Sequence, residues 1–315
     1  MLEFITANQY CWQQFRNNNR KTSRTLTADS IYAPEMTFRS QQQVQTGKSV
    51  MTTVAAIQMV SSIQIHENIE SARKLIAQAA EQGAKLVCLP EYWPSIGRND
   101  AEKLAQAEEF GKGPIQDFMS EAAKKHGIWL IGGTLSLVAP VENKVLNTTL
   151  VYDPQGEVIA RYDKIHLFSF ASGSEAYDES QYIASGDDVI SFETPFGRVG
   201  LTVCYDLRFP ELFRALGECA LIVVPSAFTY TTGKVHWEIL LRARAIENQC
   251  YVMAPAQGGR HETGRRTWGQ TILIDPWGQI TGELQEGEGV VTGEIDQSLL
   301  ASIREKLPAL KHRRL

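Results

Sequence analysis

The chain has 315 residues, a formal net charge of -5 and a hydrophobic fraction of 43%, values typical of a soluble globular protein with a sizeable core. The acidic balance, without runs of like charge, argues against nucleic acid and membrane surfaces as partners. No apolar stretch reaches the roughly 18 residues that a membrane-spanning helix needs. We therefore expect the partner to be a small molecule, with no nucleic acid and no membrane.

The five cysteines predict neither a disulfide framework nor a metal site. Cys11, Cys88, Cys204, Cys219 and Cys250 are an odd number, lie in apolar surroundings and show no Cys-x-x-Cys spacing. We expect no metal, and a reducing, cytoplasmic location fits these thiols best.

Residues 1–50 are rich in Gln, Asn, Ser, Thr and Arg and have no helical or strand period. Such a composition buries too little apolar surface to offset the entropy of ordering. We expect a disordered extension, or a start assigned too early, and one domain over residues 51–315. A transit peptide is disfavoured by the acidic residues and by Trp12.

The first part of the domain reads as strands alternating with helices. Apolar periodicity predicts, in chain order, a strand at 54–60, a helix with Ile69, Ala72, Ile76 and Ala79 on one face, a strand at 85–89, helices near 100–111 and 114–126, and a strand at 128–133. A hairpin around Asp153-Pro154-Gln155-Gly156 leads to a strand over 161–168. Residues 169–187 have little period and predict a long functional loop.

The second part repeats this alternation. We expect, in order, a hairpin over 189–203, a helix opened by Pro210, a strand at 220–225, a helix over 234–248, a strand at 250–254, a hairpin around Asp275-Pro276-Trp277-Gly278, and a helix or tail from Ser298. Hairpins among strand-helix units indicate mixed sheets in an α/β fold.

Three polar residues lie at or just beyond predicted strand ends, where α/β folds place their chemistry. These are Glu91, Lys164 and Cys204. A thiolate is a nucleophile, a nearby cation favours it, and a carboxylate can move protons between thiol, leaving amine and water. The three together suit acyl transfer.

Each residue also has a simpler interpretation. Cys204 alone would more often fill core space, Glu91 could favour a helix N-terminus, and Lys164 could be a solvated charge. His166 is a rival base, because two residues from Lys164 on a strand it would share that face. The role of base is therefore open between Glu91 and His166 on residue types alone.

Three segments in the same order resemble the Glu-Lys-Cys signature of the nitrilase, or carbon–nitrogen hydrolase, superfamily. They are Leu89-Pro90-Glu91, Tyr162-Asp163-Lys164-Ile165-His166 and Cys204-Tyr205-Asp206-Leu207-Arg208-Phe209-Pro210-Glu211. The resemblance extends over about 52–296. It implies a four-layer α-β-β-α sandwich, no cofactor, and assembly into homodimers or larger homo-oligomers.

The resemblance also implies roles for individual residues. Cys204 would form a thioester, Glu91 would be general base and acid, Lys164 would stabilise the tetrahedral intermediate, and the Tyr205 backbone N–H would bind the oxyanion. Many members carry a second glutamate after a Gly-Gly pair. Here Thr134 follows Gly132-Gly133, so either Glu142 reaches the site or that role is vacant.

Other residues are candidates for substrate binding. Arg208 could hold a substrate carboxylate or form a structural salt bridge with Asp206 or Glu211. Phe168, Phe228 and Tyr177 could line the pocket or belong to the core. We interpret Cys88, Cys219 and Cys250 as core residues.

The tyrosine and aspartate after Cys204 resemble the Nit branch of amidases, whereas nitrile-cleaving members have Trp-Glu there. We expect a cytoplasmic thiol amidase for the ω-amide of a small metabolite, such as α-ketoglutaramate or deaminated glutathione, in metabolite repair. The alternatives are a nitrilase or N-carbamoyl hydrolase, and a non-catalytic interaction protein on the same fold.

Overall fold

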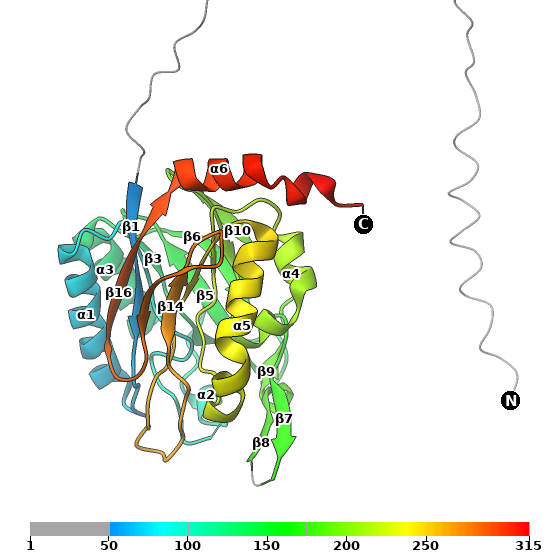
Figure 1. Ribbon diagram of the computed structural model, residues 1–315. Helices are drawn as coiled ribbons and strands as arrows, with labels where there is room; N and C mark the ends of the chain where they lie inside the picture. Colours follow the sequence, from blue (N-terminus) through cyan, green and yellow to red (C-terminus); the bar gives the residue numbers. More distant parts are fainter. Residues whose placement is uncertain (1–50, 100, 174, 315) are drawn as a thin grey trace, which may run out of the picture. The chain divides into compact units, whose positions relative to one another are not determined.

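The computed structural model describes residues 51–99, 101–173 and 175–314 (Figure 1). The expected extension over 1–50 lies outside the described residues. The domain expected from residue 51 begins with strand β1 (Met51–Gln58), which pairs antiparallel along its whole length with β16 (Gly289–Asp296) near the other end of the chain.

One sheet has eight strands, in the order β16-β1-β2-β3-β5-β4, with β6 and β9 also paired to β5. Its other strands are β2 (Leu86–Cys88), β3 (Trp129–Ile131), β4 (Leu135–Val138), β5 (Val145–Tyr152), β6 (Val158–Asp163) and β9 (Ile183–Ala184). Strands β1, β2 and β3 are parallel and the rest of the pairs along that order are antiparallel. The expected mixed sheet is confirmed.

The second sheet has six strands in simple chain order. They are β10 (Ser191–Thr194), β11 (Gly197–Leu201), β12 (Leu221–Val223), β13 (Tyr251–Ala254), β14 (Thr271–Ile274) and β15 (Ile280–Leu284). Strands β11, β12 and β13 are parallel. A separate hairpin joins β7 (Ser169–Ser172) to β8 (Glu175–Asp178).

Helices cover the outer faces of the two sheets (Figure 1). The α-helices are α1 (Ile65–Glu81), α2 (Glu102–Ala105), α3 (Pro114–His126), α4 (Pro210–Ala215), α5 (Tyr230–Asn248) and α6 (Gln297–Lys306), and the 3-10 turns are η1 (Glu179–Gln181), η2 (Cys204–Arg208) and η3 (Ala309–His312). Helices α1 and α3 pack on the first sheet, and α4 and α5 on the second. The expected four-layer α-β-β-α sandwich is confirmed.

Strand β1 shows how the sequence produces these layers. Successive side chains of a strand point to opposite faces, and here both faces are buried. Val54 and Ala56 join the core between the two sheets, whereas Ala55 and Ile57 join the core beneath α1 and α3. A continuous apolar run is therefore required in place of an alternating one.

Four details differ from the sequence expectation. The helix expected near 100–111 is only the single turn α2, and α5 begins at Tyr230, where the Thr229 side chain accepts a hydrogen bond from the Thr232 N–H. The strand expected over 161–168 ends at Asp163. The expected loop 169–187 contains the β7–β8 hairpin, η1 and β9.

The parallel strands of each sheet direct several loops to one end of the molecule. Glu91 follows β2, Cys204 follows β11 and Ser226 follows β12, and these strands run in parallel groups. The ends of two facing sheets therefore supply the residues of a single site.

Candidate active site

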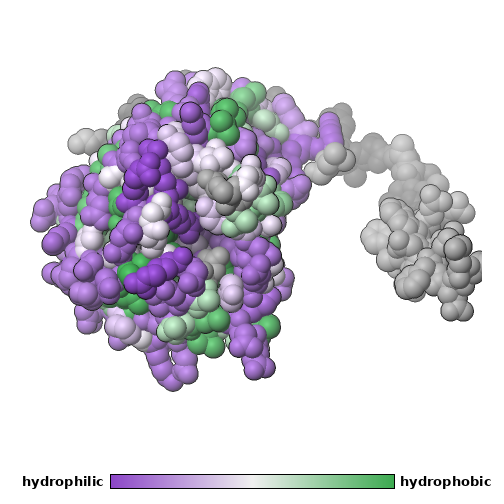
Figure 2. All heavy atoms as spheres, turned by 90° about the horizontal axis from the view of Figure 1, so that it is seen from below, coloured by the Kyte–Doolittle hydropathy of each residue, from purple (hydrophilic) through white to green (hydrophobic). Residues whose placement is uncertain are grey.

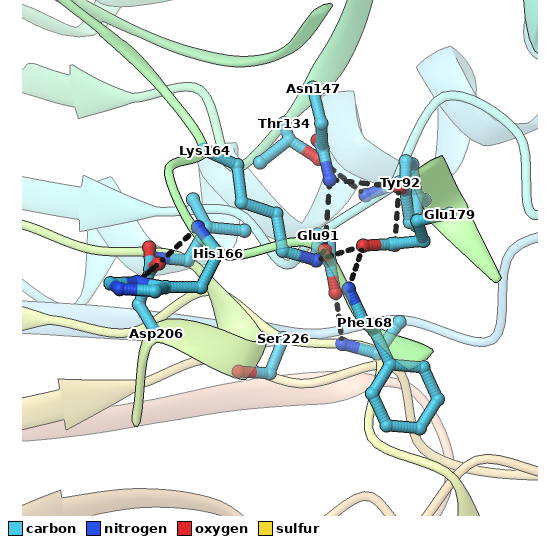
Figure 3. A network of polar contacts seen from close by, with 12 residues as sticks. Glu91, Tyr92, Thr134, Asn147, Lys164, His166, Phe168, Glu179, Asp206 and Ser226 are labelled. Atoms are coloured by element: carbon cyan, nitrogen blue, oxygen red, sulfur yellow. Dashed lines mark hydrogen bonds and ion pairs between the residues drawn. The ribbon is translucent and has the colours of Figure 1, made fainter. Parts of the chain in front are cut away.

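Glu91 lies at the base of a pocket and is almost fully buried. One carboxylate oxygen accepts hydrogen bonds from the Lys164 ammonium at 2.9 Å and the Asn147 amide at 3.0 Å. The other accepts the backbone N–H of Ala227 at 2.8 Å (Figure 3). Ala227 follows strand β12 of the second sheet, and Asn147 lies on β5 of the first. Both sheets therefore fix the position of this carboxylate.

Lys164 is buried between two carboxylates. Its ammonium lies 2.9 Å from Glu91 and 2.8 Å from Glu179. Burial disfavours the charged amine, but the attraction of Glu179 and Glu91 exceeds that penalty and raises the pKa of Lys164 above its usual range. Lys164 therefore carries a fixed positive charge beneath the pocket.

Glu179 is the glutamate that the sequence analysis missed. Its carboxylate accepts hydrogen bonds from the Tyr92 hydroxyl at 2.9 Å and from the Phe168 N–H at 2.8 Å, besides pairing with Lys164. Burial is the largest single influence and would raise the pKa of Glu179, but the charges of Lys164 and Lys103 and the hydrogen bonds from Lys164 and Phe168 together outweigh it and lower the pKa. Glu142 lies exposed in the β4–β5 turn and is not brought to the site, so the expectation that it could reach the site is wrong in its geometry.

Local backbone geometry positions the loop that carries Glu91. Tyr92 adopts a positive φ of 53°, and its N–H donates to the Thr134 hydroxyl at 2.9 Å. Gly133 also has positive φ, and a Cβ there would clash with the Pro90 carbonyl oxygen. The Gly-Gly pair thus allows close packing against the Glu91 loop, although no glutamate follows it.

Cys204 is the first residue of η2 and adopts a left-handed φ of 50°. This conformation is unfavourable for a residue with a Cβ, and such strain occurs at functional sites. The Cys204 side chain lines the same pocket as Glu91. Burial raises the pKa of the Cys204 thiol, and the Glu91 charge adds to this effect while Lys164 opposes it. These influences together favour the thiol form of Cys204 over the thiolate.

A second network holds the turn after Cys204. The buried Asp206 carboxylate accepts the Val203 N–H at 2.8 Å, the Tyr162 hydroxyl at 2.6 Å and the His166 N–H at 3.1 Å. From the sequence, Asp206 is expected only as a partner for Arg208. Through these three hydrogen bonds the Asp206 carboxylate, two residues after Cys204, holds the Cys204 turn against Tyr162 and His166.

His166 belongs to this second network. Its Nδ1 lies 2.7 Å from Asp206, and its ring stacks on Phe209 with 3.7 Å between the centroids. Figure 3 shows the His166–Asp206 pair separate from the Glu91–Lys164–Glu179 cluster. The expectation that His166 shares a strand face with Lys164 is wrong, because β6 ends at Asp163 and the alternation of a strand no longer applies.

The pocket encloses about 310 Å³ of space, part of which is open to solvent. Its lining combines reactive groups with aromatic and polar ones, including Glu91, Cys204, Phe168, Phe228, Thr232 and Arg265. Phe168 and Phe228, for which the pocket and the core were the alternatives, both line the pocket, and Tyr205 lines it as well. Tyr177 stands behind Phe168, with 5.7 Å between ring centroids.

Arg208 lies beyond the aromatic wall. Its guanidinium is 5.6 Å from the Phe228 ring centroid and 5.8 Å from that of Tyr205, and it contacts Nδ1 of His236 at 3.3 Å. Within the described part of the chain it forms no salt bridge with Asp206 or Glu211. The structural alternative expected for Arg208 is therefore wrong.

Arg265 was not identified from the sequence. It lies in the loop between β13 and β14. Among the described residues that line the pocket, Arg265 is the only Lys or Arg. Its guanidinium carbon is 5.7 Å from the Tyr177 ring centroid. The only signal for it in the sequence is weak: the Arg265-Arg266 pair within a polar loop.

Among the described residues, no group of three or more His, Cys, Asp or Glu side chains could hold a metal ion. None of the helices found in these residues is both long enough and apolar enough to cross a membrane.

The chain is similar in sequence to proteins named as amidases. The chain is 41% identical over 266 residues to deaminated glutathione amidase of Yersinia enterocolitica, covering 83% of this chain and 92% of that one. It is 38% identical to the human omega-amidase NIT2, covering 83% and 94%.

A solved structure also has a similar fold. The solved structure of Saccharomyces cerevisiae Nit3, described as a member of branch 10 of the nitrilase superfamily, matches with a TM-score of 0.76 and 31% identity, covering 84% of this chain and 97% of that one. Residues 53–305 match the carbon–nitrogen hydrolase family as a whole. The chain therefore belongs to the carbon–nitrogen hydrolase family.

Proposed function

We propose that the protein is a thiol amidase that hydrolyses the ω-amide of a small metabolite through a thioester on Cys204. One observation carries the proposal: the Glu91 carboxylate, fixed by Lys164, Asn147 and Ala227, lines the same pocket as the strained Cys204. The two relatives described above are named as amidases, one for deaminated glutathione and one for ω-amides. Carbon–nitrogen hydrolysis is the chemistry of the family to which the chain belongs.

In the first half-reaction, Glu91 accepts the Cys204 thiol proton while the sulfur attacks the amide carbonyl carbon. The carbonyl π electrons move to oxygen, and the resulting oxyanion accepts a hydrogen bond from the Tyr205 backbone N–H. Lys164 contributes positive charge nearby. When the intermediate collapses, the carbon–nitrogen bond breaks and the proton on Glu91 passes to the leaving nitrogen. The amine departs and the acyl group remains on sulfur.

In the second half-reaction, water attacks the thioester. Glu91 accepts a proton from the water as its oxygen bonds to the acyl carbon. The carbon–sulfur bond then breaks, the Cys204 sulfur regains the proton, and a carboxylic acid is released. No cofactor is consumed, and the enzyme returns to its starting protonation.

Glu179 takes the role of second glutamate in this proposal. Through Lys164 it adds a second negative charge beneath the pocket, and through Tyr92 it orders the residue that follows Glu91. Lys164 is held by two carboxylates, which keeps its ammonium beside Glu91 throughout the cycle. Glu179 is thus a positioning residue.

Substrate recognition is assigned to the wall and rim of the pocket. The aromatic wall suits a short acyl chain, which Phe168 and Phe228 would contact along its methylene groups. Arg208, which has no carboxylate partner among the described residues, is proposed to bind the carboxylate of the acyl portion. Amides such as α-ketoglutaramate and deaminated glutathione have this form.

Assembly and location are part of the same proposal. Helix α5 exposes Val235, Ile239 and Ile246 at spacings of four and seven residues, and Trp277 is exposed as well. We infer that a second copy covers this apolar stripe in a homodimer or a larger homo-oligomer. The four cysteines in the described residues are free, which supports a reducing, cytoplasmic location.

The test is release of ammonia or amine from a panel of α-ketoglutaramate, deaminated glutathione, glutamine, an aliphatic nitrile and an N-carbamoyl amine. We expect Cys204-dependent release from one or both ω-amides, abolished in Cys204→Ala. Activity on the nitrile or the N-carbamoyl compound alone would replace the amidase proposal. No turnover, with unchanged protein mass after substrate addition, would favour a non-catalytic interaction protein.

A further inference from the structure

Lys103 is a buried lysine that has no part in the mechanism described above. It lies on α2, near the end of the molecule from which the β7–β8 hairpin projects (Figure 1). The face seen from that end is mostly hydrophilic, with only small apolar patches (Figure 2), so a lysine there could reach water. Lys103 is instead only 3% exposed. Because burial of an ammonium group is unfavourable unless its surroundings stabilise the charge, the contacts of Lys103 indicate its role.

The ammonium group of Lys103 lies over the ring of Tyr92, 3.8 Å from the ring centroid. A cation is attracted by the negative face of an aromatic ring, most strongly where water is excluded, and Tyr92 is buried. The Tyr92 hydroxyl donates a hydrogen bond to the Glu179 carboxylate at 2.9 Å. Positive charge over the ring draws electron density away from the hydroxyl. The hydrogen bond that Tyr92 donates to Glu179 is therefore strengthened.

The Tyr92 hydroxyl closes a ring of polar contacts that includes the proposed base. It accepts a hydrogen bond from the Asn147 amide at 2.8 Å, and the same amide donates to Glu91 at 3.0 Å. Lys164 joins Glu91 to Glu179 and so completes the ring (Figure 3). A change at Tyr92 is therefore transmitted to Glu91 from two sides.

Charge is a second link between Lys103 and this ring. The ring contains two carboxylates, Glu91 and Glu179, but one ammonium group, Lys164, so its excess charge is negative. A buried excess charge is unfavourable, and the positive charge of Lys103 offsets it. Burial would raise the pKa of Glu179, but the charges of Lys164 and Lys103, with the hydrogen bonds from Lys164 and Phe168, lower it. Glu179 thus stays ionised and paired with Lys164.

From these contacts we propose that Lys103 is a positioning residue, which holds the Glu91–Lys164–Glu179 cluster in its reactive arrangement through Tyr92. This inference rests on the proposed function and adds a residue to it. Lys103 is not among the described residues that line the pocket, so it acts without touching the substrate. Removing its charge should slow proton transfer from the Cys204 thiol and leave substrate binding unchanged.

The experiment measures alkylation of Cys204 by iodoacetamide at neutral pH, followed by mass spectrometry of peptides. The rate depends on how readily the thiol loses its proton, and no amide has to be hydrolysed. Lys103→Met removes the charge and keeps a long side chain. We expect alkylation in this variant to slow about tenfold, because a less ordered cluster with more negative charge disfavours the thiolate. Native rates in folded Lys103→Met protein would overturn the inference.

Two further variants separate charge from packing. Lys103→Arg keeps a cation over the ring and should recover at least about a third of the native rate. Lys112→Met is the matched control, because Lys112 is exposed and pairs with Glu109 at 2.9 Å on the surface. It should keep the native alkylation rate. Lys103→Arg protein that is folded but as slow as Lys103→Met would show that charge is not the cause and would overturn the inference.

The route through Tyr92 and Glu179 is tested with the lysine in place. Tyr92→Phe keeps the ring beneath Lys103 and loses only the hydroxyl that reaches Glu179, so it should slow alkylation as Lys103→Met does. This variant also serves if Lys103→Met does not fold. In a Glu179→Gln background, Lys103→Met should add less than about threefold, because the two substitutions break one pathway. A native rate in Tyr92→Phe, or independent effects of the two substitutions, would contradict the proposed route.

Steady-state kinetics separate failure of this inference from failure of the proposed function. For an ω-amide that the native protein hydrolyses, Lys103→Met should lower kcat about tenfold and change KM less than about threefold. A raised KM with native kcat would assign Lys103 to substrate binding and contradict the inference. If no amide is hydrolysed, the amidase proposal fails, whereas the alkylation rates still support or contradict the role of Lys103.

Discussion

The charged groups of the site fall into two regions that differ in how they are paired. We call the buried cluster of Glu91, Lys164 and Glu179 the floor, and the two arginines Arg208 and Arg265 the rim. At the floor, Glu91, Lys164 and Glu179 are buried, and each charge is met by an opposite charge and further hydrogen bonds. At the rim, Arg208 and Arg265 lie against aromatic rings and have no carboxylate partner among the described residues. Saturated charges stay in place during a reaction, whereas unsaturated ones can bind a ligand. We therefore assign chemistry to the floor and selection to the rim.

The largest effect should come from Glu91→Gln. The amide keeps the size of the side chain but cannot accept the Cys204 proton, and a positioned general base contributes about 10²- to 10⁴-fold. We expect kcat for the preferred ω-amide to decrease by a factor of about 10² to 10⁴. Circular dichroism and thermal unfolding should show that the variant is folded. A kcat within tenfold of the native value would exclude Glu91 as the base.

Glu179→Gln should lower stability in a pH-dependent way. Because the pKa of Glu179 is lowered in the folded protein, its ionised form adds stability above the ordinary glutamate pKa of 4.5, and this stability is lost as pH falls through the folded pKa. Breaking a buried ion pair costs about 3–5 kcal/mol. We expect a deficit of about 3 kcal/mol in the free energy of unfolding at pH 7.

The measurement for Glu179→Gln is urea unfolding of native and variant protein at pH 7 and near pH 3. The deficit should shrink at the lower pH, because Glu179 of the unfolded native protein takes up a proton below its ordinary pKa of 4.5, whereas Glu179 of the folded protein, with a pKa of about 2, stays mostly ionised. Glu142→Gln is the control and should change stability by less than about 0.5 kcal/mol, since Glu142 is exposed. A deficit that is independent of pH would show that charge is not its cause.

Arg208→Gln tests the rim. If Arg208 binds the substrate while Glu91 and Cys204 carry out the reaction, the variant should raise KM about tenfold and change kcat by less than about threefold. Steady-state kinetics with α-ketoglutaramate measure both values. A fall in kcat with unchanged KM would assign Arg208 to the floor chemistry and break the division between floor and rim.

The smallest effect is expected for His166→Ala. His166 contacts Asp206 and Phe209, on the far side of the Cys204 turn from the Glu91 cluster. Its loss leaves Asp206 bonded to Val203 and Tyr162, so activity should fall less than about tenfold. A loss as large as that of Glu91→Gln, with an intact fold, would revive His166 as the base.

The sequence predicted those parts of the fold that depend on local pattern. The apolar runs of β1, β2 and β11 and the turns at Asp153 and Asp275 are encoded within a few residues, and the three strand-end residues follow from them. The four layers and the roles of the trio came from family resemblance.

The remaining parts depend on contacts between distant segments. Glu179 lies 15 residues beyond Lys164 and 87 beyond its partner Tyr92, within a segment that had no readable period. Arg265 reaches the pocket from a loop of the second sheet. The local sequence of such residues does not indicate which distant groups they will face, so Glu142 was considered where Glu179 is found.

The central claim is that an acyl group is carried on Cys204, and its most direct test is rapid quenching followed by mass spectrometry of peptides. Native protein mixed with the preferred ω-amide and quenched in acid should carry the substrate's acyl group on the peptide that contains Cys204. Cys204→Ala should carry none and should not turn over. Undiminished turnover in Cys204→Ala, or an acyl group attached to another residue, would contradict the account.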